Sequence, residues 1–131
     1  MVERLLKLVG PAHIAGGLLV FTSGFIPTAQ AWLESLFAQT GELVWSPFFV
    51  AVLGPTIASW GLLFAIVVNQ FYETPSPRLW KSLVAAVAIW APLDTALCLY
   101  FGLYAGAVLN AVVVVGLAAL LIAAKPLTYG R

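Results

Sequence analysis

Long apolar runs separated by short polar segments dominate the pattern of this chain. Four runs, residues 5–27, 44–71, 79–103 and 105–124, each have the roughly 20 mostly apolar residues that a helix needs to cross a bilayer. The segment 28–43 is more polar, and its apolar residues recur at helical spacing, which is typical of a short amphipathic helix at the membrane interface. The pattern therefore predicts an all-α membrane protein: a four-transmembrane-helix antiparallel bundle with a short interfacial helix between spans 1 and 2.

The composition supports the same fold class. The chain has 131 residues, of which 63% are hydrophobic and only 8% are charged, whereas soluble domains carry about 25% charged residues. Five acidic and six basic side chains cannot cover a soluble surface of this size. We therefore expect one integral membrane domain over residues 1–131, in contact with the lipid bilayer. The net charge of +1 gives no electrostatic basis for binding nucleic acid.

The basic residues predict an orientation. Lys and Arg in short loops mark the cytoplasmic side of a membrane protein. All six basic residues of this chain would flank the spans on one side: Arg4, Lys7, Arg78, Lys81, Lys125 and Arg131. We therefore expect both termini to be cytoplasmic, and we expect the membrane to be a bacterial inner membrane.

A cleaved signal peptide is the competing interpretation of the N-terminus. Ala29-Gln30-Ala31 matches an A-x-A cleavage site, and Arg4 and Lys7 would form the basic region before the apolar run. However, the run is longer than the roughly 7–15 residues usual in such peptides, and Pro11 and His13 interrupt it. The sequence therefore favours a first span that is retained.

Asp94 is an acidic residue deep inside an apolar span, which makes it the first candidate for a functional residue. An ionisable group at the centre of a membrane helix costs roughly 2.5–3.5 kcal/mol on insertion scales. At 1.5 Å per residue, Asp94 lies roughly 20–23 Å from the basic edge of its span, and Asn110 in the next span reaches about the same level. Since these two spans are joined by a very short link, we predict an Asp94–Asn110 contact. Thr22 and Ser23 of the first span fall at a similar depth and would join them in one hydrogen-bonded cluster.

His13, Trp60, Trp90 and Ser59 form a second set of candidates nearer mid-depth. His13 lies roughly 12 Å from the basic edge, at the level expected for Ser59 and Trp60. Trp90 precedes Asp94 by one helical turn and shares its face. The two indoles and His13 either line a pocket for a flat apolar ligand, such as a lipid, quinone or carotenoid, or fill the core between helices.

The chemistry expected of an enzyme is sparse. One cysteine, Cys98, excludes an intrachain disulfide. A metal site needs several His, Cys or carboxylate ligands, and one His, one Cys and one intramembrane Asp do not supply them, so we expect no metal site. Nucleophile-elbow, zinc-protease and phosphate-loop motifs are missing. We therefore expect no catalytic residues. A membrane enzyme acting on lipid or prenyl substrates, with His13 as base and Ser59 beside it, remains a third interpretation.

Pairs of small residues mark helix faces that can approach closely. In lipid, close backbone approach supplies much of the packing energy between helices. We expect most such pairs to pack inside the bundle and the rest to form a seam with a second copy. The pairs are Ala12 and Gly16, Gly54 and Ala58, Gly61 and Ala65, and Ala119 and Ala123.

These observations favour a small integral membrane protein that acts through packing. It would be an accessory or assembly subunit, or a self-associating module in a homo-oligomer or a larger membrane complex, and it would hold lipid or an apolar cofactor. The Asp94–Asn110 contact would fix the hairpin or a partner. The alternative is a small proton-coupled transporter or channel centred on Asp94, with Pro92 and Gly54-Pro55 as flexible points where helices open to line a cavity.

Overall fold

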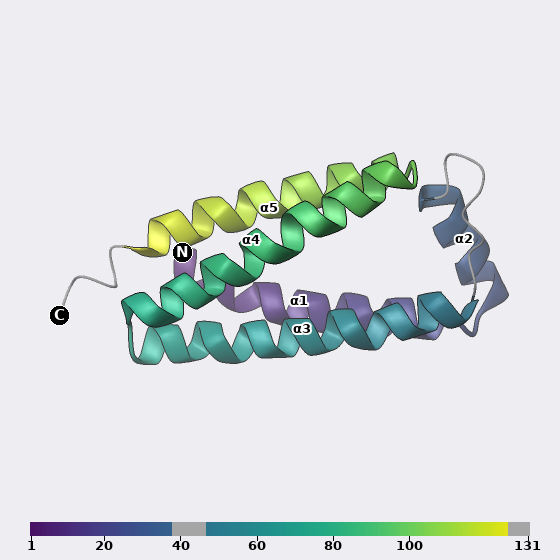
Figure 1. The fold of residues 1–131 in the computed structure, drawn as a ribbon. Coiled ribbons are helices and arrows are strands. Elements are labelled where there is room, and N and C mark those ends of the chain that lie inside the picture. The colour runs from purple at the N-terminus through teal and green to yellow at the C-terminus, as the bar shows by residue number, and fades with distance from the viewer. Residues whose placement is uncertain (38–46, 126–131) are drawn as a thin grey trace.

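The computed structural model describes residues 1–37 and 47–125, which form five helices in this part of the chain (Figure 1). Four of the five, all except the second, are long and apolar enough to cross a membrane. The predicted all-α, four-span bundle is therefore confirmed, and the chain is a small membrane protein. The helices are α1 (Val2–Ser23), α2 (Pro27–Phe37), α3 (Pro47–Glu73), α4 (Pro77–Tyr100) and α5 (Tyr104–Ala124).

The helix ends differ from the predicted spans by a few residues. Helix α1 begins at Val2, before the start of the predicted span. An ion pair of 2.7 Å between Lys7 and Glu3, four residues apart, stabilises its first turns. The helix ends at Ser23, four residues early, since Pro27 starts α2 and proline suits the first position of a helix. Helix α2 confirms the short interfacial helix. The end of the predicted interfacial segment 28–43, the first residues of the predicted span 44–71 and Arg131 lie outside the described residues.

The spanning helices form two pairs (Figure 1). Helices α1 and α3 run side by side along their length, and α4 and α5 form a hairpin above them. The two pairs lie closest at the end that holds the N-terminus, the α3–α4 turn and the end of α5, and they diverge toward α2. We call the first of these ends the basic end, because it carries the five basic residues within the described ranges: Arg4, Lys7, Arg78, Lys81 and Lys125.

A seam of glycine and alanine residues holds α1 against α3. A methyl group added at Gly17 would lie 2.5 Å from both the backbone nitrogen of Ala58 and the carbonyl oxygen of Gly54, so the two backbones touch. Gly10 and Gly24 make similar contacts, and these three glycines recur every seven residues. A seven-residue repeat keeps one face of a helix turned to its partner. The facing residues on α3 are Ala51, Gly54, Ala58, Gly61 and Ala65.

Two of the four predicted small-residue pairs lie in this seam, and two do not. The pairs that begin at Gly54 and Gly61 pack inside the bundle as expected. The pair of Ala12 and Gly16 faces outward, since Ala12 is exposed and a methyl group on Gly16 would meet nothing within 4 Å. Ala119 and Ala123 are exposed as well. Four-residue spacing alone does not distinguish a face turned to a helix from a face turned to lipid.

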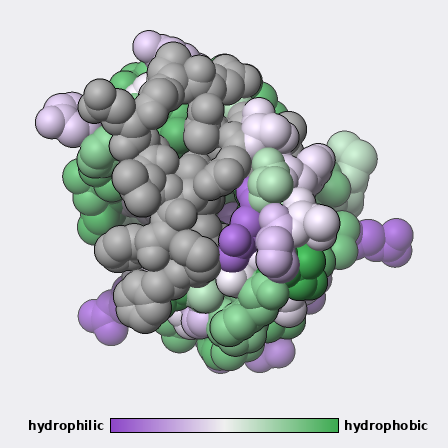
Figure 2. Space-filling model, turned by 90° about the vertical axis from the view of Figure 1, so that its right-hand side faces the viewer, coloured by the Kyte–Doolittle hydropathy of each residue, from purple (hydrophilic) through white to green (hydrophobic). Residues whose placement is uncertain are grey.

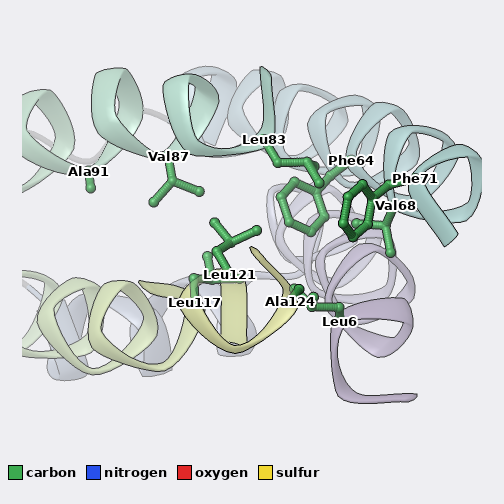
Figure 3. Close-up of a cluster of buried hydrophobic side chains, with 10 residues drawn as sticks. All are labelled: Leu6, Phe64, Val68, Phe71, Leu83, Val87, Ala91, Leu117, Leu121 and Ala124. Carbon is green, nitrogen blue, oxygen red and sulfur yellow. The ribbon is translucent and has the colours of Figure 1, made fainter. Parts of the chain in front are cut away.

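The buried apolar cluster lies toward the basic end and joins the two pairs (Figure 3). Trp80 ties the hairpin together there, because its indole Nε1 donates a hydrogen bond of 2.8 Å to the carbonyl of Leu121. That carbonyl lies in the last turn of α5 and also accepts a hydrogen bond from the backbone N–H of Lys125, so it receives two donors. The cluster contains Leu6, Phe64, Val68, Phe71, Leu83, Val87, Ala91, Leu117, Leu121 and Ala124.

Adjacent glycines provide a direct test of the seam. We expect Gly17→Ala to lower the free energy of unfolding by about 1–3 kcal/mol, because the new methyl group meets backbone atoms that cannot rotate away. Gly16→Ala should cause no loss, since its methyl group enters open space and alanine favours the helix. Equilibrium unfolding in mixed micelles, followed by circular dichroism, measures both. Equal stabilities for the two variants would contradict the seam.

Candidate functional site

The turn between α4 and α5 sets the register of the hairpin. Gly102 has a φ of 70°, a conformation that glycine adopts without strain. Beside it, the backbone nitrogen of Leu103 donates a hydrogen bond of 2.7 Å to the carbonyl of Cys98. Gly106 lets the helices approach, since a methyl group there would lie 3.0 Å from the Cys98 sulfur. This register brings the inward faces of α4 and α5 together at the level of Asp94.

Asp94 and Asn110 are in contact, as the sequence predicts. The Nδ2 atom of Asn110 donates a hydrogen bond to Oδ2 of Asp94. The same amide nitrogen lies 3.9 Å from the Cys98 sulfur, a weak acceptor one turn further along α4. Asn110 is buried, with 8% of its surface exposed, and Asp94 is half-buried. We call Asp94 and Asn110 the polar pair.

The polar pair continues the inward faces of the hairpin beyond the apolar cluster. Asp94 follows Val87 by seven residues on α4, and Asn110 precedes Leu117 by seven residues on α5; both of these apolar residues are buried. Residues seven apart lie on nearly the same side of a helix. The carboxylate therefore has a hydrogen-bond donor on the helix next to its own, which reduces the cost of placing it at membrane depth.

The structure brings His13, Trp60 and Trp90 together and adds Phe64. The centroid of the Trp60 ring lies 4.7 Å from that of His13, 5.0 Å from that of Phe64 and 5.6 Å from that of Trp90. These four rings, which we call the aromatic layer, come from α1, α3 and α4 and join the two helix pairs. Phe64 follows Trp60 by four residues, a helical spacing that marks it in the sequence. Contact between the rings favours the interpretation that they fill the core.

His13 has a partner on its own helix. Its Nδ1 lies 2.8 Å from the carbonyl oxygen of Val9. Because a carbonyl only accepts hydrogen bonds, Nδ1 is the nitrogen that carries a proton in this contact. The geometry is that of a histidine held in place by backbone and by the Trp60 ring.

The hydroxyl candidates donate hydrogen bonds within their own helices and not to the polar pair. Thr22 is exposed and donates to the carbonyls of Leu18 and Leu19, at 3.0 and 2.9 Å. Ser23 is buried but donates to a carbonyl of its own helix at 2.7 Å. The structure thus does not place either residue in the expected cluster. Ser59 is exposed and donates to its own helix at 3.0 Å, so it does not supply a second polar group on the inward face.

Helices α3 and α4 continue through their prolines. Pro55 lies inside α3 and Pro92 inside α4, and both helices are continuous on either side of the proline. The expected opening of the helices at these points is therefore not seen in this structure. Within residues 1–37 and 47–125, no group of three His, Cys, Asp or Glu residues is placed to hold a metal ion.

Comparisons with protein-family models, with curated proteins and with solved structures give no match to this chain. The polar pair and the aromatic layer are the two groups of residues with contacts between helices that can carry a function. The polar pair can stabilise the hairpin or exchange a proton, and the aromatic layer can hold the two helix pairs together.

The polar pair predicts a stability difference between two asparagines. We expect Asn110→Leu to lower the free energy of unfolding by about 1–2 kcal/mol, because the carboxylate of Asp94 loses its hydrogen-bond donor. The matched control is Asn69→Leu, at an exposed position of α3, which should change stability by less than about 0.5 kcal/mol. Equilibrium unfolding in mixed micelles measures the free energy of unfolding of both variants. If Asn110→Leu leaves this free energy unchanged, the polar pair does not stabilise the hairpin.

Proposed function

We propose that this chain is an accessory or assembly subunit of a membrane complex and that it acts through packing. The observation that carries the proposal is the position of the polar pair, which is contained within one helical hairpin. The hydrogen-bond partner of Asp94 is the neutral amide of Asn110 and not a cation. This contact holds the carboxylate at a fixed position between α4 and α5. A hairpin fixed in this way presents a defined surface to a neighbouring chain.

The other polar groups of the spans support a structural role. Thr22, Ser23 and Ser59 donate to carbonyls of their own helices, and His13 contacts a carbonyl of α1. Such bonds satisfy a side chain locally and make no link to the next helix. These four side chains therefore do not link Asp94 by hydrogen bonds to either end of the bundle.

The outer surface of the bundle is suited to contact with lipid or with other membrane helices. Large apolar side chains are exposed on each spanning helix, among them Leu18, Leu62, Ile89 and Val115. The view onto the end with α2 shows hydrophobic residues over much of the flank of the molecule (Figure 2). The small residues that face outward on α1 and α5 would let a partner helix or a second copy approach closely.

Two variants of one residue test this role. We expect Asp94→Asn to keep the assembly, because an amide at this position still hydrogen-bonds to Asn110, whereas Asp94→Leu should reduce it strongly by leaving the buried amide unpaired. Native mass spectrometry of protein taken gently from its own membrane measures the mass of the complex. Normal assembly of both variants would contradict the role of the polar pair, and a bare monomer in the wild type would contradict the assembly function.

A second candidate function is proton-coupled transport centred on Asp94. One observation favours it: only Oδ2 of the carboxylate accepts a hydrogen bond from the described residues, and the side chain is half-buried. Under this proposal Asp94 is the titrating group and Asn110 positions it.

Proton flux separates the two functions. If Asp94 carries protons, Asp94→Asn should abolish pH-gradient-driven flux into liposomes while the variant stays folded, because an amide does not take up a proton in this range. If Asp94 is structural, wild type and Asp94→Asn should give the same low flux as empty liposomes. Circular dichroism of wild type and Asp94→Asn in the same liposomes checks that a loss of flux does not come from unfolding.

A further inference from the structure

The outward face of α4 carries a hollow at the basic end. It is an open hollow of about 450 Å³, lined by Arg78, Lys81, Ser82 and Ala85. Lys81, Ser82 and Ala85 lie three, four and seven residues after Arg78 in the first three turns of the helix, so the four residues share one face. The hollow exists because Ser82 and Ala85 are small and lie beside two long basic side chains.

The two cations of the hollow differ from Lys7 and Lys125 at the same end. Lys7 is paired with Glu3 at 2.7 Å, and Lys125 lies over the Trp80 ring, 5.4 Å from its centroid. Arg78 and Lys81 are exposed and form no ion pair with the described residues. The Ser82 hydroxyl is used within the helix, since it donates to the carbonyl of Arg78 at 3.1 Å. The guanidinium and the ammonium are thus the groups available to an anion.

The same face becomes apolar as it leaves the basic end. Ala85 is exposed, and it is followed at four-residue spacing by Ile89, which is 65% exposed, and by Leu93, which is 62% exposed. The face therefore has two positive charges at the level of the membrane surface and an apolar strip that runs into the hydrocarbon. Its ligand should have an anionic head and an apolar tail.

We propose that this face binds an anionic phospholipid. The phosphate lies between Arg78 and Lys81, and an acyl chain lies over Ala85 toward Ile89. Charge complementarity selects the anionic head, and the apolar strip distinguishes a lipid from a free phosphate ion. The proposal is independent of the role of Asp94, which lies on the inward face of the same helix.

Lipid titrations of the full chain test the site. Phosphatidylglycerol, phosphatidylcholine and inorganic phosphate are added separately to the protein in a neutral detergent, and bound species are counted by native mass spectrometry. We expect tighter binding of phosphatidylglycerol than of phosphatidylcholine. Each of Arg78→Gln and Lys81→Gln should weaken the phosphatidylglycerol complex about fivefold. Arg4→Gln, an exposed basic residue of the same end that does not line the hollow, should leave the affinity within about twofold.

A steric variant tests the hollow with both charges kept. Ala85→Leu fills the hollow and should weaken phosphatidylglycerol binding, whereas Ala96→Leu, further along the exposed face, should not. Circular dichroism checks that each variant is folded. If Arg4→Gln and Arg78→Gln lower the affinity for phosphatidylglycerol equally, the lipid is attracted by the basic end as a whole and not by a site in the hollow. This result would overturn the proposal. Binding of inorganic phosphate as tight as that of phosphatidylglycerol, or equal binding of the two lipids, would also overturn it.

Discussion

Lipid is the solvent of most of this surface, and it is as apolar as the side chains it meets. Helices in a bilayer therefore gain little from hiding apolar groups, and they associate through close packing and a few hydrogen bonds. The structure uses each of these at a different place. Backbone contact at the glycine seam joins α1 to α3, and the polar pair and Trp80 join α4 to α5. Rings and buried aliphatic residues then join one pair to the other.

This division gives the two polar regions of the molecule different surroundings. The polar pair lies inside the hairpin, where the carboxylate of Asp94 accepts a hydrogen bond from Asn110 on the next helix of the chain. The charges of Arg78 and Lys81 lie on the outside of the same helix, at its basic end. One face of α4 therefore supports the fold, and the opposite face meets the membrane. Under the two proposals, a chain of this size combines a hairpin that its polar pair stabilises with a surface that selects a lipid or a partner.

The sequence predicts the spans and the Asp94–Asn110 contact well, and the reason is physical. A run of about 20 apolar residues can hardly be anything but a membrane helix, and two such helices joined by a turn at Gly102 must face each other. The glycine seam is harder to predict, because faces turned to lipid and faces turned to a helix are both apolar. Gly16 and Gly17 are adjacent, yet only Gly17 touches α3. The seven-residue repeat of Gly10, Gly17 and Gly24 is the signal that separates them.

The positions of the hydroxyl side chains are also hard to predict, because a polar side chain does not have to face the interior of the bundle. Thr22 and Ser59 satisfy their hydroxyls on their own helices, so they can face outward at little cost. A carboxylate has no donor to give in this way and needs one from elsewhere, which is why Asp94 was predictable and Thr22 was not.

The most direct test of this account is a double-mutant cycle on the polar pair. The free energies of unfolding of wild type, Asp94→Leu, Asn110→Leu and the double variant are measured in the same mixed micelles. If the two side chains stabilise the hairpin through each other, the cycle should give a coupling energy of about 1 kcal/mol or more. Effects that add to within about 0.3 kcal/mol would show that Asp94 and Asn110 act independently, and would contradict the account.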